Sequence, residues 1–327
     1  MMFNKAFRNQ DYEIYFNTVS GVEVMQGRDG KEDPFALDLP SLLDVGIMGH
    51  CKHKCRFCYQ GHENEPNMKL EDFKSIIDQV KHHTNQVALG GRGDPNHHED
   101  FEEIVKYARS NGVVPNYTTS GIDLTPEHIE ISKLCGAVAV SDYYQSYTYD
   151  ALNKFMNAGI KTNIHLIFHY GSYGSVMKIL YGYDPWVGLV DLDRLNAVIF
   201  LLFKPAGAGE KLPWKPLEDE LDNFSNLVFN NKAKFKIGMD SCLINHVLKR
   251  IEPNEIQRMS IDSCEAARMS GYITPDMRFM PCSFADKEKW AIPITKKKDI
   301  EYIWNRSRPF KQFRQMLKKN QCCPLGL

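Results

Sequence analysis

The chain of 327 residues lacks any long hydrophobic run. Its longest apolar stretch, Ala197 to Phe203, has the length of a strand, whereas a membrane-spanning helix needs about 20 apolar residues. The first residues, MMFNKAFRNQDYEIYF, also lack the basic and then apolar pattern of a signal peptide. We therefore expect a cytoplasmic protein without a membrane partner.

An excess of charge of one sign is also missing. The chain has 40 Lys and Arg residues against 41 Asp and Glu residues, a net charge of −1. Because general nucleic-acid binders neutralise many phosphates with basic side chains, this balance argues against a nucleic-acid partner. Low-complexity tracts and short repeats are absent as well. The 43% hydrophobic and 25% charged residues are typical of a folded globular protein.

Cysteine, in contrast, is plentiful. Of nine cysteines, three lie within eight residues, five lie in the last third of the chain, and Cys135 stands alone. In a reducing compartment, clustered cysteines bind metal more often than they form disulfides. Cys135 lies between Leu134 and Gly136 and is expected to be a small buried hydrophobic residue. The two groups of cysteines are therefore the first indication of function.

Strand-like and helix-like segments alternate over the first two thirds of the chain. Between the strands, apolar residues recur at helical spacing, as at Phe73, Ile76 and Val80. This alternation predicts an α/β fold, a partial (β/α)6 TIM-like barrel with a parallel sheet and right-handed crossovers. The expected strands are 41–48, 86–89, 112–118, 137–141, 161–168 and 197–203. Ligands of such folds bind at the C-terminal ends of the strands, where the unusual residues of this chain lie.

The pattern changes after Gly209. A strand before Cys242 and a hairpin that ends at Cys282 predict a small C-terminal α+β extension. At the front of the chain, YEIYFNTVSGVEVMQG predicts a hairpin in a segment too short for an independent peptide-recognition domain. We therefore expect an N-terminal hairpin extension (1–40), a partial barrel (41–210) and a C-terminal domain (211–327).

The first group of cysteines, Cys51-x3-Cys55-x2-Cys58, directly follows the first expected strand. Thiolates are soft ligands that suit zinc or iron–sulfur clusters. Three cysteines leave one iron of a four-iron cluster without a protein ligand and therefore open to a small molecule. Because His50 and His53 lie beside the triplet, a zinc site is the alternative.

The segment CKHKCRFCYQG resembles the CxxxCxxC signature of radical S-adenosylmethionine (SAM) enzymes. The resemblance implies that Cys51, Cys55 and Cys58 hold a [4Fe-4S] cluster whose open iron chelates SAM. It also implies that an electron donor such as flavodoxin or ferredoxin reduces the cluster. SAM is then cleaved to a 5′-deoxyadenosyl radical, which abstracts a substrate hydrogen. Phe57, directly before the third cysteine, would pack near the adenine.

The segment GGRGDP after the second expected strand is similar to the glycine-rich motif of the same family. The resemblance implies that the backbone at Gly90, Gly91 and Gly93 approaches SAM closely. Arg92 occupies the position of the usual acid, so we expect Asp94 to take over the role of binding the methionyl amine. A simple loop with a capping aspartate is the alternative.

Two further residues are implied as SAM contacts. Ser141, after the fourth expected strand, matches the family's position that contacts the ribose or the carboxylate of SAM. Asn163 is expected to face the same side of its strand as His165, towards SAM or the substrate. The alternatives are an ordinary turn serine and a satisfied buried polar pair.

The second group of cysteines resembles the auxiliary-cluster extension that follows many radical SAM barrels, in its shorter SPASM/twitch-like form. The resemblance implies a second [4Fe-4S] cluster, and a zinc site is the alternative. Adjacent residues are poorly placed to bind two irons of one cluster, so only one of Cys322 and Cys323 is the fourth ligand. The expected ligands are Cys242, Cys264, Cys282 and either Cys322 or Cys323.

The combination of barrel and extension implies an enzyme of the oxidoreductase or peptide-maturase class. The expected reaction is the crosslinking, epimerisation or oxidation of a peptide or protein. One alternative is the radical oxidation or rearrangement of a small molecule, such as an aminocyclitol or a cofactor precursor. A non-catalytic iron–sulfur or zinc protein is the other.

Overall fold

The computed structural model describes residues 2–258, 261, 263–320 and 323–326. These residues form a ten-stranded sheet in the order β10-β9-β8-β7-β6-β5-β4-β11-β12-β13. From β4 to β10 each strand runs parallel to the next one in the chain. These strands are β4 (Leu42–Gly49), β5 (Gln86–Arg92), β6 (Val114–Thr119), β7 (Val138–Ser141), β8 (Thr162–Phe168), β9 (Ala197–Leu202) and β10 (Lys236–Met239). The predicted α/β fold with a partial parallel barrel is confirmed.

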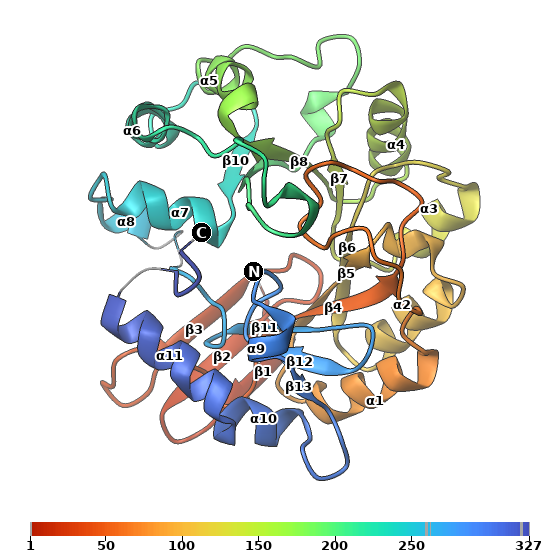
Figure 1. Cartoon of the computed structure of the whole chain (residues 1–327), viewed down its shortest axis with the longest axis vertical. Helices are drawn as coiled ribbons and strands as arrows, with labels where there is room; N and C mark the ends of the chain where they lie inside the picture. Colours follow the sequence, from red (N-terminus) through yellow and green to blue (C-terminus); the bar gives the residue numbers. More distant parts are fainter. Residues whose placement is uncertain (1, 259–260, 262, 321–322, 327) are drawn as a thin grey trace.

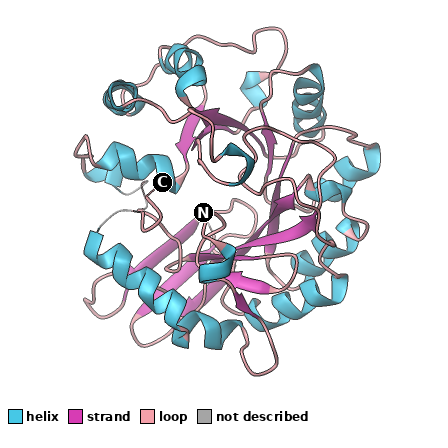
Figure 2. Ribbon diagram, in the orientation of Figure 1, coloured by secondary structure: helices cyan, strands magenta, loops and turns pink. Residues whose placement is uncertain are grey.

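A helix follows each strand from β4 to β10 and lies on the outer side of the sheet (Figures 1 and 2). In α1, Phe73, Ile76 and Val80 are fully buried, as their helical spacing predicts. Pro126 begins α3, and the Thr125 side chain accepts a hydrogen bond from the His128 amide. The helices are α1 (Leu70–Val80), α2 (Phe101–Ser110), α3 (Pro126–Ser132), α4 (Ser146–Asn157), α5 (Tyr173–Leu180), α6 (Glu218–Val228) and α7 (Ser241–Leu248). Short 3-10 turns lie at η1 (Pro95–His97), η2 (Tyr170–Ser172), η3 (Leu192–Arg194) and η4 (Gly207–Gly209).

The N-terminal segment is a three-stranded antiparallel sheet of β1 (Lys5–Arg8), β2 (Tyr12–Phe16) and β3 (Glu23–Gly27). The expected hairpin corresponds to β2 and β3, and the structure adds β1. The Lys5 ammonium donates to the carbonyls of Lys81, Thr84 and Gly112, which lie in the turns from α1 to β5 and from α2 to β6. The small sheet therefore covers the N-terminal end of the barrel, opposite the ends where the first cysteines lie.

The C-terminal segment continues the barrel sheet. Strand β11 pairs in parallel with β4, and β12 and β13 follow it in antiparallel order. Strand β10 also lies beyond position 210 and pairs with β9. One sheet thus joins the segments that we expect to be separate domains, whose boundaries stay a prediction. The elements are α8 (Glu255–Arg258), β11 (Ser270–Ile273), β12 (Arg278–Met280), α9 (Lys287–Trp290), β13 (Ile292–Pro293), α10 (Ile300–Arg306) and α11 (Arg308–Asn320).

Aromatic side chains fix the last two helices to this added part of the sheet. Trp304 of α10 stacks on Phe279 of β12, with ring centroids 6.0 Å apart. Its indole nitrogen donates to the Leu37 carbonyl at 2.8 Å. None of the helices in the described part of the chain is long and apolar enough to cross a membrane.

Candidate active site

The cysteine triplet lies on the loop of residues 50–69, between β4 and α1. The Cys58 amide donates to the Cys55 carbonyl at 3.1 Å, and the His53 amide donates to the Cys51 sulfur at 3.3 Å. Burial raises the pKa of the Cys51 and Cys55 thiols, and the neighbouring Cys58 and Asp94 add to the shift. The loop therefore brings the three thiols into electrostatic range of one another and of Asp94.

Two glycine-containing loops press against this cysteine loop, and Figure 1 shows the loop after β9 beside it. A Cβ atom added at Gly93 would lie 2.6 Å from the His50 carbonyl oxygen, and one at Gly207 would lie 2.7 Å from that of Cys58. The Ala208 amide donates to this same Cys58 carbonyl at 2.9 Å. Only glycine allows so close an approach, and both glycines have positive φ.

Gly207→Ala is expected to shift the cysteine loop and lower the iron bound at the triplet. Gly188→Ala is the matched control, because Gly188 also has positive φ but an added Cβ would meet nothing within 4 Å. Both variants place an alanine in the left-handed backbone region, which destabilises the fold by about 1 kcal/mol. Only Gly207→Ala adds a steric conflict with the cysteine loop. Iron content after anaerobic reconstitution separates the two variants. Equal iron loss in both would contradict the close approach.

Gly90, Gly91 and Arg92 of the GGRGDP segment belong to β5, which therefore extends beyond the expected strand 86–89. The Asp94 carboxylate joins the rest of this segment to the end of β6. It accepts hydrogen bonds from the Ser120 amide at 2.9 Å, the Ser120 hydroxyl at 2.5 Å and the Thr119 hydroxyl at 3.0 Å. It does not cap the η1 turn that it precedes. Asp94 thus lies at the C-terminal strand ends with its carboxylate fixed. An added Cβ at Gly90 would meet nothing within 4 Å, so the backbone there is open.

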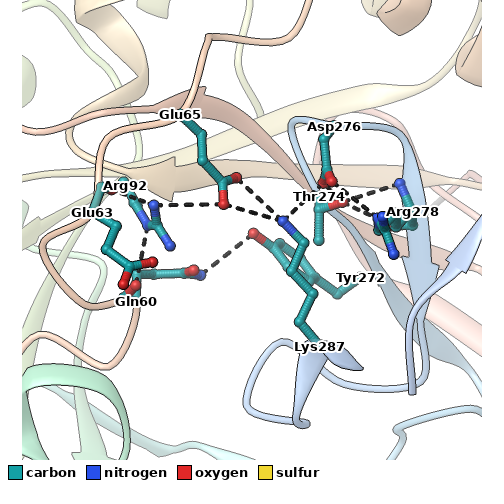
Figure 3. Close-up of polar contacts among 9 residues, drawn as sticks. All are labelled: Gln60, Glu63, Glu65, Arg92, Tyr272, Thr274, Asp276, Arg278 and Lys287. Carbon is teal, nitrogen blue, oxygen red and sulfur yellow. Dashed lines mark hydrogen bonds and ion pairs between the residues drawn. The ribbon is translucent and has the colours of Figure 1, made fainter. Parts of the chain in front are cut away.

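Arg92, where the resemblance to the glycine-rich motif implies an acid, turns towards the cysteine loop (Figure 3). Its Nε donates to the Gln60 carbonyl at 3.1 Å, and its Nη1 donates to the Glu63 carbonyl. The same Nη1 lies 3.7 Å from Glu65 Oε1. The guanidinium therefore binds the loop that carries the triplet.

Phe57 lies in a group of aromatic rings that sequence reasoning missed. Its ring centroid is 5.8 Å from those of both Tyr143 and Trp214, and His169 stacks on Trp214 at 4.7 Å. Ser141 hydrogen-bonds the Tyr143 hydroxyl. Tyr143 had a signal in the sequence, because it lies two residues after the end of the fourth expected strand, whereas Trp214 lies in a loop without one.

Asn163 lies near the start of β8, away from the strand ends that gather the other residues. Its side-chain oxygen accepts a hydrogen bond from Asn196 Nδ2 at 2.7 Å. Ser141 is in register with His165, two residues further along β8. The polar partner of Asn163 is thus Asn196 rather than His165, and a contact of Asn163 with SAM stays a prediction.

Four cysteines of the second group approach one another from four segments of the chain. Cys242 lies in the first turn of α7, Cys264 before β11, Cys282 after β12 and Cys323 after α11. Burial raises the pKa of Cys242 to about 12, of Cys264 to about 11 and of Cys282 well above its usual range, and the other thiols of the group contribute. Cys322 lies outside the described residues. Among those described, no three His, Cys, Asp or Glu side chains are arranged around a single metal ion.

A short chain of contacts links the two groups of cysteines. The Tyr59 ring, next to Cys58, lies 4.6 Å from the Phe284 ring. The Lys204 ammonium lies 4.9 Å from the centre of the Phe284 ring and forms an ion pair with Asp240. Phe284 and Asp240 lie two residues from Cys282 and Cys242, so these side chains occupy the space between the groups. Cys135 lies apart from both, and burial raises its pKa to about 12.

Asp44 is a titratable side chain within the sheet that the sequence analysis did not single out. It is the cross-strand neighbour of Tyr272 on β11. Burial alone raises the pKa of Asp44 to about 6. The only signal in the sequence is a charged residue inside the apolar strand SLLDVGIM.

Asp44→Asn is expected to stabilise the protein at neutral pH. Because the pKa is higher in the folded chain than the ordinary 3.8, ionisation opposes folding, and stability falls as the pH rises from about 4 to about 6. The penalty above this window is up to about 3 kcal/mol, and the isosteric amide removes it. The midpoint of thermal unfolding between pH 4 and 8 tests this. A lower midpoint for Asp44→Asn at pH 7 would show instead that the carboxylate makes a stabilising interaction.

Comparison with known proteins points to the same family that the cysteine triplet resembles. Residues 45–173 match the family model of the Radical SAM superfamily. Mycofactocin maturase MftC of Mycolicibacterium smegmatis is 22% identical over 316 residues, which cover 89% of this chain and 76% of that protein. MftC of Mycobacterium tuberculosis is 31% identical over 94 residues, which cover 28% of this chain and 24% of that protein.

Two solved structures share the fold. SuiB of Streptococcus suis bound to S-adenosylmethionine has a TM-score of 0.68 and 17% identity, and covers 89% of this chain and 72% of its own. The enzyme anSMEcpe with bound AdoMet and Cp18Cys peptide has a TM-score of 0.61 and 16% identity, with 84% and 83% covered. The family implies SAM and a [4Fe-4S] cluster as cofactors. The triplet and the GGRGDP segment both lie inside residues 45–173, the part of this chain that matches the Radical SAM superfamily.

Proposed function

We propose that Cys51, Cys55 and Cys58 hold a [4Fe-4S] cluster that binds SAM, and that the enzyme modifies a peptide or protein. The single observation that carries the first part is the position of three half-buried thiols on one loop at the C-terminal end of β4. The donor set fits the group, because soft thiolates suit iron and three of them leave one iron for SAM. When reduced, the bound cluster and SAM supply a 5′-deoxyadenosyl radical that abstracts hydrogen.

The other residues of the site bind and orient SAM. The Phe57, Tyr143 and Trp214 rings form an apolar wall suited to the adenine. The open backbone at Gly90 allows close approach, and Gly91 and Gly93 let their loop lie against β4 and the cysteine loop.

The polar groups of the site have separate tasks. The fixed Asp94 carboxylate offers a negative charge for the methionyl amine, while Ser120 keeps it in place. Ser141, at the end of β7, would contact the ribose or the carboxylate of SAM. The assignment of Asn163 has the least support, because the side chain already bonds Asn196 at the start of β8.

We also infer a second [4Fe-4S] cluster, held by Cys242, Cys264, Cys282 and Cys323. Its support is that these four thiols act on one another's pKa, which places them within electrostatic range of one another. Zinc on the same four thiols is the second candidate, since it takes the same ligands. Cys322 would then be the spare thiol.

The peptide substrate is supported by what related proteins bind. A structure of SuiB with its precursor peptide SuiA has a TM-score of 0.66 to this chain and 17% identity, and covers 85% of this chain and 67% of its own. The anSMEcpe structure contains a peptide as well, and the M. smegmatis relative is named a maturase. We further expect flavodoxin or ferredoxin to be the electron donor.

Mass spectrometry tests the substrate class. The reconstituted, reduced enzyme is incubated with SAM and short peptides encoded beside its gene, each uniformly deuterated. Deuterium in 5′-deoxyadenosine together with a mass change in one peptide is the expected result. Deuterium transfer only from a small aminocyclitol or a cofactor precursor would contradict the peptide proposal, and the Cys51→Ala variant gives the background.

A further inference from the structure

The cysteine loop has little regular structure of its own. Residues 50–69 of this loop contain no helix and no strand. Ordering such a loop costs conformational entropy for each residue that is fixed. Its position therefore depends on side chains that reach it from elsewhere, and Arg92 is one of these.

Arg92 holds this loop by its backbone. Its Nε and Nη1 donate to the carbonyls of Gln60 and Glu63, and its side chain is only 16% exposed. These two carbonyls follow Cys58 within five residues. The rigid guanidinium presents several donors in one plane, which neither lysine nor the acid usual at this position offers.

The contacts continue from the loop into the C-terminal segment (Figure 3). Glu65, which faces Arg92, also receives Lys287 Nζ of α9 at 3.1 Å. The same Nζ lies 3.1 Å from Asp276 Oδ1, and Asp276 pairs with Arg278 at 3.0 Å. Charges alternate in sign along the whole series, so each ion pair supports the next.

A second contact also joins the cysteine loop to the C-terminal segment. Gln60 Nε2 donates to the Tyr272 hydroxyl at 3.4 Å, and Tyr272 belongs to β11. An added Cβ at Gly46 would lie 2.6 Å from this hydroxyl, so β4 leaves room for the ring. Gln60, whose carbonyl accepts a hydrogen bond from Arg92, thus also contacts the C-terminal segment through its side chain.

We propose that Arg92 is a positioning residue that holds the cysteine loop in the geometry needed for SAM binding, and that Lys287 links this geometry to the C-terminal segment. The inference rests on the proposed SAM-binding cluster. It gives a function to the residue that replaces the usual acid. Arg92 acts on the loop and not on SAM, so restoring the acid does not restore a SAM contact.

The test uses the full reconstituted chain and compares Arg92→Gln, Arg92→Glu and Lys287→Met with Lys289→Met. Lys289 is the matched control, because it lies on the same helix α9 and is exposed. The readouts are the change that SAM causes in the EPR spectrum of the reduced enzyme, and separate KM and kcat values for SAM cleavage. The midpoint of thermal unfolding reports whether each variant is folded.

Arg92→Gln and Arg92→Glu are expected to raise KM for SAM about 10- to 100-fold, the usual range for partners that orient a ligand, and to weaken the SAM-induced EPR change. Lys287→Met is expected to raise KM by less, and Lys289→Met to match the unmodified protein. A normal KM and EPR change in folded Arg92→Gln would overturn the role of Arg92, as would an improved KM in Arg92→Glu.

A normal result for Lys287→Met would overturn the link to the C-terminal segment, even if an Arg92 variant fails to fold. Failure of the proposed function is distinguishable from all of these outcomes. In that case the unmodified enzyme itself forms no 5′-deoxyadenosine.

Discussion

Cys51→Ala is expected to lose the first cluster and with it all formation of 5′-deoxyadenosine above the enzyme-free background. Two remaining thiols on the loop cannot supply the three ligands that leave one iron open for SAM. The Cys51 thiol is half-buried, and the neighbouring Cys58 and Asp94 act on its pKa, so its loss removes one of the three grouped ligands. Anaerobic reconstitution, reduction and chromatography of the nucleoside measure the effect.

Cys135→Ala is the matched control for this variant. Cys135 is also partly buried but packs against the apolar core, where burial raises the pKa of its thiol and the Arg109 charge offsets part of the shift. The control is expected to bind iron and cleave SAM like the unmodified protein. Equal activity of Cys51→Ala and Cys135→Ala would contradict the role given to the triplet.

The triple variant Cys242→Ala/Cys264→Ala/Cys282→Ala is expected to lose about four irons, those of one [4Fe-4S] cluster, and to keep those at the triplet. The three thiols come from α7 and from both ends of the β11–β12 hairpin region, so their removal leaves only Cys323 among the described thiols of this group. Metal analysis of the unmodified and triple-variant proteins gives the number directly.

The same metal analysis distinguishes iron from zinc. One zinc lost in the triple variant, with the iron unchanged, would support the zinc alternative and contradict the second cluster. Unchanged iron and zinc would show that these cysteines bind no metal. A loss of all iron would show that the second site is needed for the first to form, and would contradict the expectation that the triplet keeps its irons.

The parallel strands were predictable because each is a short apolar run followed by an amphipathic helix. Segment 161–168 corresponds to β8 (Thr162–Phe168), and segment 197–203 to β9 (Ala197–Leu202). The pairing of β11 with β4 was not predictable, since nothing local to either strand specifies a partner so far along the chain. Sheet order between distant strands is set by tertiary packing rather than by periodicity.

Part of the candidate site was likewise predictable from the sequence, and part of it was not. The spacing of Cys51, Cys55 and Cys58 and the GGRGDP loop were visible because they are local motifs. The approach of Trp214 to Phe57 depends on the path of a loop, which no pattern encodes. Arg92 was visible only as a departure from the expected acid, and its hydrogen bonds to the cysteine loop required the three-dimensional arrangement.

The most direct test of the central claim is SAM cleavage by the unmodified protein. The chain is reconstituted without oxygen, its iron is counted, and it is reduced with dithionite in the presence of SAM. We expect 5′-deoxyadenosine and methionine to form only when protein, SAM and reductant are all present. A preparation with about four irons bound at the triplet that forms no 5′-deoxyadenosine would contradict it.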